Sequence, residues 1–131
     1  MDTLDRLSHE HEDLRATLAP IESAAEARDA AALAASLEAA RAALTDELDV
    51  HIVTEETDIF TPVATHLGED LVAVFYEEHV EIRATRDDIF ARLERGEAPY
   101  EPSLRLCELI LAHQQREDLM LFPSAREALG D

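Results

Sequence analysis

The sequence predicts an all-α protein, an up-down-up-down antiparallel four-helix bundle. Ala, Leu, Glu and Arg dominate the 131-residue chain, and its three glycines and five prolines leave few positions that would interrupt a helix. Apolar residues recur at helical spacing in four long segments. The connections between these segments are short, which makes neighbouring helices antiparallel. No segment competes as a strand, and a chain of this length is most simply one domain, so residues 1–131 are expected to form a single bundle.

The four helices follow from the positions of their caps and breakers. The first is expected over about residues 3–26, with a kink at Pro20. The second begins after Asp29, a candidate N-cap, and continues through an Ala-rich but periodic opening to about residue 63. A turn around Gly68 leads into the third helix, over about residues 70–95. The fourth follows the loop GEAPYEP, with Ser103 as a candidate cap, and ends near residue 128.

Composition narrows the possible partners and the cellular compartment. The formal net charge of −19 disfavours binding to nucleic acid or to anionic lipid. The chain has no run of about 18 apolar residues, and its N-terminus is charged from the second residue, so we expect neither a membrane-spanning helix nor a signal peptide. Cys107 is the single cysteine, which permits no internal disulfide and fits a reducing cytoplasm. No feature of the sequence indicates a particular oligomeric state.

The chain contains a degenerate internal duplication. The segment EHEDLR at residues 10–15 resembles EHVEIR at residues 78–83. The segment HIVTEETDIFTP at residues 51–62 resembles HQQREDLMLFP at residues 113–123, with one residue of difference between Phe and Pro. Each half would form a helical hairpin that carries first an EHxx(L/I)R motif and then an HxxxE motif. Two such hairpins would form a pseudo-two-fold bundle with these motifs near its middle.

Four of the six histidines are expected to point into the bundle, one from each helix. With about 100° of rotation per residue, they share a face with the apolar residues of their own helices; they are His11, His51, His79 and His113. The other two, His9 and His66, do not belong to this set. Glu55 and Glu117 stand four residues after His51 and His113, which places them on the same inner face.

This combination of side chains favours a metal site. A single histidine on an apolar face is usually a core residue with a hydrogen-bond partner, but burying ionised Glu55 and Glu117 is costly without a counter-charge. Arg83 and Arg86 lie near the inner face of the third helix and could satisfy one glutamate at most. Imidazole and carboxylate ligands suit iron, manganese or zinc. Four imidazoles and two carboxylates exceed the needs of one ion and fit two, with each glutamate able to bridge.

The order H…HxxxE…H…HxxxE, with a Phe-Pro signature shortly after the glutamate, resembles the hemerythrin-like (HHE cation-binding) family over essentially the whole chain. This resemblance implies a four-helix bundle with two non-haem iron ions joined by an oxo or hydroxo bridge. The ligand roles it implies are His11 and His51 on one iron, His79 and His113 on the other, and Glu55 and Glu117 as bridging carboxylates. Ferritin-like di-iron bundles need Glu-x-x-His pairs instead, and no histidine here has an acidic residue three positions before it.

The sequence departs from the oxygen-carrying hemerythrins, which have HxxxH on the third helix and HxxxxD on the fourth. Phe75 and Arg83 stand four residues before and after His79, so the second histidine of that helix is missing. Tyr76 is a candidate for an additional ligand or, equally, a bundle-edge aromatic residue. With so few protein ligands, each iron is expected to keep an exchangeable position.

On the fourth helix, two neighbouring carboxylates compete for the bridging role. Asp118 stands five residues after His113, where the oxygen carriers have their aspartate. A straight helix turns Asp118 about 140° away from His113, so Glu117 is the preferred bridge and Asp118 the alternative.

Two main functions are compatible with this site. An unsaturated di-iron site favours reaction with peroxide, O2 or nitric oxide, so the leading hypothesis is a cytoplasmic protein with catalase- or peroxidase-like redox chemistry. The alternative is a non-enzymatic protein that binds or senses O2, nitric oxide or iron. A third hypothesis is a helical interaction module with a structural metal. No separate catalytic acid or base can be named.

Overall fold

The computed structural model describes residues 2–129, which form four helical rods joined by short connections. Three segments of π-helix, labelled η, continue the α-helices without a break. The first rod is α1 (Thr3–Glu26). The second consists of α2 (Ala30–Ala42), η1 (Ala43–Glu47), α3 (Leu48–Glu55), η2 (Glu56–Phe60) and α4 (Thr61–Leu67). The third is α5 (Asp70–Glu94), and the fourth consists of α6 (Tyr100–Arg116), η3 (Glu117–Leu121) and α7 (Phe122–Leu129).

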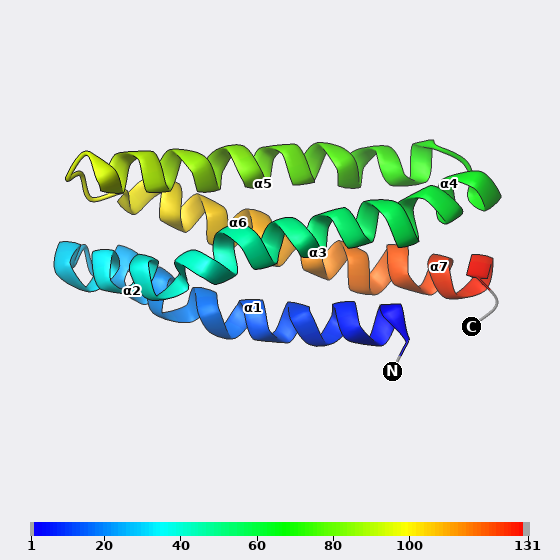
Figure 1. Cartoon of the computed structure of the whole chain (residues 1–131), viewed down its shortest axis with the longest axis horizontal. Coiled ribbons are helices and arrows are strands. Elements are labelled where there is room, and N and C mark those ends of the chain that lie inside the picture. Colours follow the sequence, from blue (N-terminus) through cyan, green and yellow to red (C-terminus); the bar gives the residue numbers. More distant parts are fainter. Residues whose placement is uncertain (1, 130–131) are drawn as a thin grey trace.

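The rods lie side by side and alternate in direction, and both ends of the chain lie at the same end of the bundle (Figure 1). Helix α1 packs against α2 and α6, and α6 also packs against α5. The predicted up-down-up-down four-helix bundle is therefore confirmed.

Most helix limits agree with those predicted from the sequence, but one predicted N-cap is wrong. The side chain of Asp29 accepts a hydrogen bond from the Ala32 backbone N–H at 3.0 Å, as expected of an N-cap. Gly68 ends α4 with a φ of 103°, which favours glycine. Ser103 is not a cap, because α6 begins at Tyr100 and its first turn includes Pro102. A proline fits there because the N–H that it lacks would have no partner within the helix.

Two clusters of apolar residues form the core, one towards each end of the bundle. The larger lies around α2 and the neighbouring parts of the other rods, and includes Leu18, Leu33, Leu37, Ile89, Leu106 and Cys107. The smaller lies at the end that holds both termini, and includes Leu4, Leu7, Ile59, Phe60, Phe75 and Phe122. The two clusters leave the middle of the bundle to the polar side chains described below.

Two of the π-helical segments redirect phenylalanines into the core. Phe60 and Phe122 each stand nine residues after a buried histidine, His51 or His113. On a straight α-helix, nine steps of about 100° would place them on roughly the opposite face. Both are nevertheless buried. Phe60 is the last residue of η2 and Phe122 directly follows η3, and the wider turn of a π-helix rotates both residues back toward the inner face.

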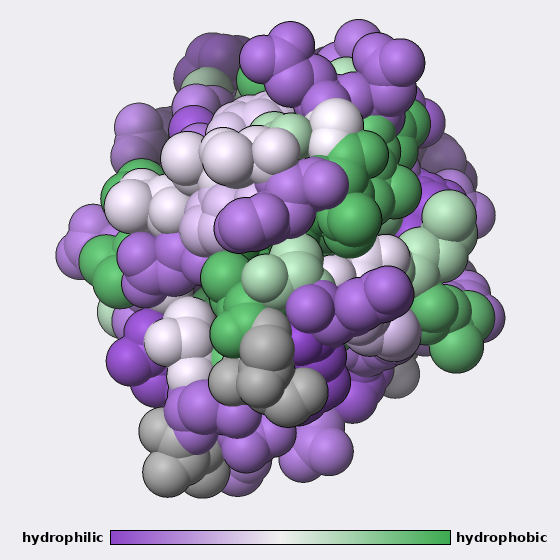
Figure 2. All heavy atoms as spheres, turned by 90° about the vertical axis from the view of Figure 1, so that its right-hand side faces the viewer, coloured by the Kyte–Doolittle hydropathy of each residue, from purple (hydrophilic) through white to green (hydrophobic). Residues whose placement is uncertain are grey.

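At the end that carries both termini, hydrophilic residues cover most of the surface, and hydrophobic ones form separate small patches (Figure 2). Among residues 2–129, no helix combines the length and the apolar character needed to cross a membrane.

Candidate metal centre

The six side chains singled out in the sequence meet in the middle of the bundle, between the two apolar clusters. All are buried, with no more than 9% of any residue exposed, and they come from all four rods: His11 on α1, His51 and Glu55 on α3, His79 on α5, His113 on α6 and Glu117 in η3. The two histidines left out of the predicted set, His9 and His66, are exposed.

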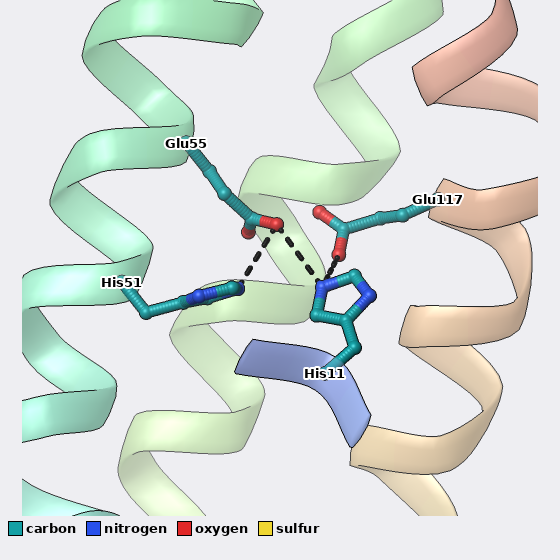
Figure 3. A group of neighbouring side chains, drawn as sticks. All are labelled: His11, His51, Glu55 and Glu117. Carbon is teal, nitrogen blue, oxygen red and sulfur yellow. Dashed lines mark ion pairs between the residues drawn. The ribbon is translucent and has the colours of Figure 1, made fainter. Parts of the chain in front are cut away.

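The first group of candidate ligands consists of His11, His51, Glu55 and Glu117, whose side chains point toward one another (Figure 3). His11 Nε2 lies 3.0 Å from Glu117 Oε1 and 3.4 Å from Glu55 Oε2. His51 Nε2 lies 3.1 Å from the same Glu55 oxygen. One ligand atom from each residue lies within 4.8 Å of the ligand atoms of the other three, a spacing that could hold a single ion.

The second group consists of His79, His113 and the same two glutamates. His79 Nε2 lies 3.0 Å from Glu55 Oε1, and His113 Nε2 lies 3.1 Å from Glu117 Oε2. Each glutamate therefore turns one oxygen to the first group and its other oxygen to the second. This is the arrangement expected of a carboxylate shared by two ions.

Each of the four histidines also meets a second carboxylate on its outer side. His11 Nδ1 lies 3.3 Å from Asp118, and His51 Nδ1 lies 2.7 Å from Glu10. The other two contacts are His79 Nδ1 to Glu56 at 2.8 Å and His113 Nδ1 to Glu78 at 2.7 Å. An ionised carboxylate only accepts hydrogen bonds, so each Nδ1 carries the proton and donates it. In the neutral imidazole this leaves the Nε2 lone pair facing the centre, as a metal ligand requires.

The outer contacts of the two halves correspond to each other through the internal duplication. Glu10 and Glu78, which directly precede His11 and His79, each bind the second histidine of their own hairpin. Glu56 and Asp118, which directly follow the inner glutamates, each bind the first histidine of the other hairpin. The outer role of these carboxylates was not predicted: Asp118 was considered only as an alternative bridge, and Glu10, Glu56 and Glu78 were not singled out. The acidic residue at each pair of corresponding positions in the two halves was a visible signal.

Aromatic rings close the centre on the side of the smaller apolar cluster. The ring of Phe60 stacks on His79 with centroids 5.1 Å apart, and Phe122 stacks on His11 at 5.4 Å. Phe75 meets the ring of His113 edge-on at 5.8 Å. These contacts keep the imidazoles in place and exclude water from that side.

The buried polar atoms fit metal ions better than they fit one another. His11 Nε2, Glu55 Oε2 and both oxygens of Glu117 are buried without a properly directed hydrogen bond, despite their short separations. His79 Nε2 and His113 Nε2 face each other at 3.0 Å. Imidazole nitrogens and carboxylate oxygens that converge in this way, without directed hydrogen bonds between them, are arranged to bind cations.

Arginine does not supply the missing counter-charge. The guanidinium of Arg86 donates to Asp49 at 2.7 Å and to the Leu44 carbonyl at 3.1 Å, and Arg83 Nε lies 3.7 Å from Asp49. Both arginines therefore pair with an aspartate away from the centre, which removes the simplest structural alternative to a metal site.

Comparison with known proteins agrees with this geometry. The family model described as the hemerythrin HHE cation binding domain matches residues 2–125. The chain belongs to the hemerythrin HHE family. No curated protein and no solved structure matches it. Family membership and the two groups of buried ligands together support a metal-binding protein.

Three residues that bear on the comparison of this hemerythrin-domain protein with the oxygen carriers can now be located. Phe75, one of the positions where a second histidine of α5 would stand, is buried in the smaller apolar cluster. Tyr76 is 38% exposed and packs edge-on against Phe60 at the bundle edge. The side chain of Asp118 is 40% exposed and lies outside His11, whereas Glu117 is fully buried between the two groups.

Protons provide the positive charge when no metal is bound. Burial lowers the pKa of His11, but the Glu117 and Glu55 carboxylates outweigh it and raise the pKa to about 9. The same opposition raises the pKa of His113 to about 10. Burial raises the pKa of Glu55, but its four histidine neighbours hold it well below the ordinary value. Metal binding at neutral pH must therefore displace protons from His11 and His113.

The metal-free protein should be most stable between about pH 5 and 6.5. The raised pKa values of His11 and His113 give stability that is complete below their ordinary pKa of 6.5 and is lost as the pH rises to 9–10. The lowered pKa of Glu55 gives stability that is present above its ordinary pKa of 4.5 and is lost as the pH falls. Urea unfolding of the metal-free protein from pH 4 to 10 measures this profile.

A His9→Gln variant should keep the profile, because the side chain of His9 is exposed and pairs with the similarly exposed Asp13. His113→Gln should flatten the alkaline side of the profile. A wild-type stability that rises steadily from pH 6.5 to 9 would contradict the assigned charges.

Proposed function

We propose that this hemerythrin-domain protein holds two non-haem iron ions and reacts with hydrogen peroxide or other small oxidants. The observation that carries the proposal is that Glu55 and Glu117 are each shared between the two ligand groups. His11 and His51 would hold one ion, and His79 and His113 the other. Each glutamate would contribute one oxygen to each ion.

The donor atoms suit iron. They are imidazole nitrogens and carboxylate oxygens, with no thiolate among them. Cys107 lies in the larger apolar cluster, where burial raises the pKa of its thiol to about 12. A buried free thiol on this chain is compatible with a reducing compartment, and we propose the cytoplasm.

Iron in this site supplies one-electron redox chemistry toward peroxide, O2 or nitric oxide. The chain's contribution is to hold and shield the ligands. The outer carboxylates keep each Nδ1 protonated and each Nε2 directed inward, and the stacked rings of Phe60 and Phe122 exclude water. Phe75 brings a hydrocarbon ring to a position where a second histidine of α5 would stand, which supports an exchangeable position on the ion held by His79 and His113.

Iron loading followed by exposure to peroxide tests this function. Anaerobic reconstitution with ferrous iron should give about two ions per chain, and added hydrogen peroxide should then release O2. His79→Ala should lower that rate by at least about tenfold, since it removes an inner nitrogen. His66→Ala is the matched control, because His66 is exposed at the end of α4, and it should keep the wild-type rate.

Fewer than about one iron per chain in the wild-type protein would overturn the di-iron proposal. Two ions with a reversible response to O2 or nitric oxide but no peroxide turnover would instead support a binding or sensing protein.

A pair of neighbouring substitutions separates inner from outer carboxylates. Glu117→Ala should reduce the bound iron and lower the melting temperature of the loaded protein, because metal binds only the folded bundle. Asp118→Ala should keep the iron count but weaken the affinity by about 10- to 100-fold, the usual effect of losing an outer partner of a ligand. Metal analysis and thermal unfolding measure both. The reverse result, iron lost in Asp118→Ala and kept in Glu117→Ala, would make Asp118 the bridge.

A further inference from the structure

A small cavity adjoins the centre on the side opposite the stacked phenylalanines. It has room for about 20 Å³, which suits a molecule the size of water or a diatomic gas. One part of its wall is formed by the inner imidazoles and Glu55. The rest is aliphatic except for one carboxamide, and these residues are Leu14, Leu48, Ile52, Ile82, Ile110 and Gln114.

Apart from the imidazoles and Glu55, the wall of this cavity consists of three pairs of corresponding positions in the two hairpins. Leu14 in the first hairpin corresponds to Ile82 in the second, and Leu48 corresponds to Ile110. The remaining pair is Ile52 and Gln114, each directly after a histidine. Among the residues that line the cavity, Gln114 is thus the one at which the second hairpin has a polar group where the first has a hydrocarbon.

The orientation of the Gln114 amide is fixed from outside the cavity. Arg15 on α1 donates from its guanidinium to Gln114 Oε1 at 3.2 Å. Arginine has only donors, so the atom that faces it must be the carbonyl oxygen. The amide nitrogen is therefore the other atom, and it is buried without a hydrogen-bond partner. Gln114 as a whole is only 2% exposed, so bulk water does not satisfy this donor.

An unpaired N–H2 group is costly to bury, and apolar Ile52 shows that the fold accepts a hydrocarbon at the equivalent position. We propose that Gln114 is a specificity residue that donates a hydrogen bond to a small oxygen- or nitrogen-containing molecule bound in this cavity. Arg15 is the positioning residue that presents the amide. The inference rests on the proposed function, because it assumes that such molecules bind beside the metal ions.

Azide is a suitable probe because it is stable and accepts hydrogen bonds through its terminal nitrogens, one of which is small enough to enter a cavity of about 20 Å³. In the iron-loaded protein, Gln114→Ile should weaken azide binding by roughly 3- to 10-fold, mainly through faster dissociation. The substitution copies the residue of the other hairpin. A second variant, Gln114→Glu, keeps an acceptor for Arg15 but loses the donor when ionised, and should weaken azide in the same direction. Ser103→Ala is the control, since Ser103 has a buried unpaired hydroxyl on the same helix but does not line the cavity.

An infrared readout separates a hydrogen bond from a packing effect. The stretching frequency of bound azide should shift between H2O and D2O in the wild-type and Ser103→Ala proteins, and should lose that shift in both Gln114 variants. Equal affinity and an equal isotope shift in wild type and both Gln114 variants would overturn the inference while leaving the proposed function intact. A wild-type protein that binds no iron would overturn the proposed function, and this inference with it.

Discussion

Two glutamates, Glu55 and Glu117, lie fully buried halfway along the bundle, and the rest of the structure depends on the positive charge that they require. Their oxygens are surrounded by imidazole nitrogens from every rod, while the nearby arginines pair elsewhere with Asp49. Protons on His11 and His113 meet the requirement in the metal-free protein, and metal ions would meet it in the loaded one. The two apolar clusters on either side stabilise the bundle by hydrophobic packing and contribute no charge to the centre.

The internal duplication explains how so many polar groups meet in a small space. Each hairpin supplies one shared glutamate, two inward histidines and two outer carboxylates, and the outer contacts join the hairpins to each other as well as closing each hairpin. Because of this symmetry, each of the two ligand groups contains two histidines and the same two glutamates. The departure from symmetry at Ile52 and Gln114 adds one carboxamide to the otherwise aliphatic part of the cavity wall, which is where discrimination between small molecules can arise.

Helical periodicity was sufficient to predict the bundle and the inward direction of the four histidines, because those residues share an uninterrupted helix face with leucines such as Leu7 and Leu48. The same reasoning could not place Phe60 and Phe122, since a straight helix turns them away and only the π-helical segments bring them back. It also missed Glu10 and Glu56, whose partners lie on other rods and become neighbours only after folding. Ser103 was wrongly predicted to be an N-cap. Serine is a common N-cap residue, and its type alone does not show that it lies three residues after the start of α6 and not at the start.

In the loaded protein, we expect the two buried glutamates to be shared by two metal ions. A crystal structure of the iron-loaded protein, with anomalous data collected on both sides of the iron absorption edge, tests it most directly. We expect two anomalous peaks, one bound by Nε2 of His11 and His51 and the other by Nε2 of His79 and His113, with Glu55 and Glu117 reaching both. A single peak, or ions bound on the outer side by Nδ1 and the outer carboxylates, would contradict it.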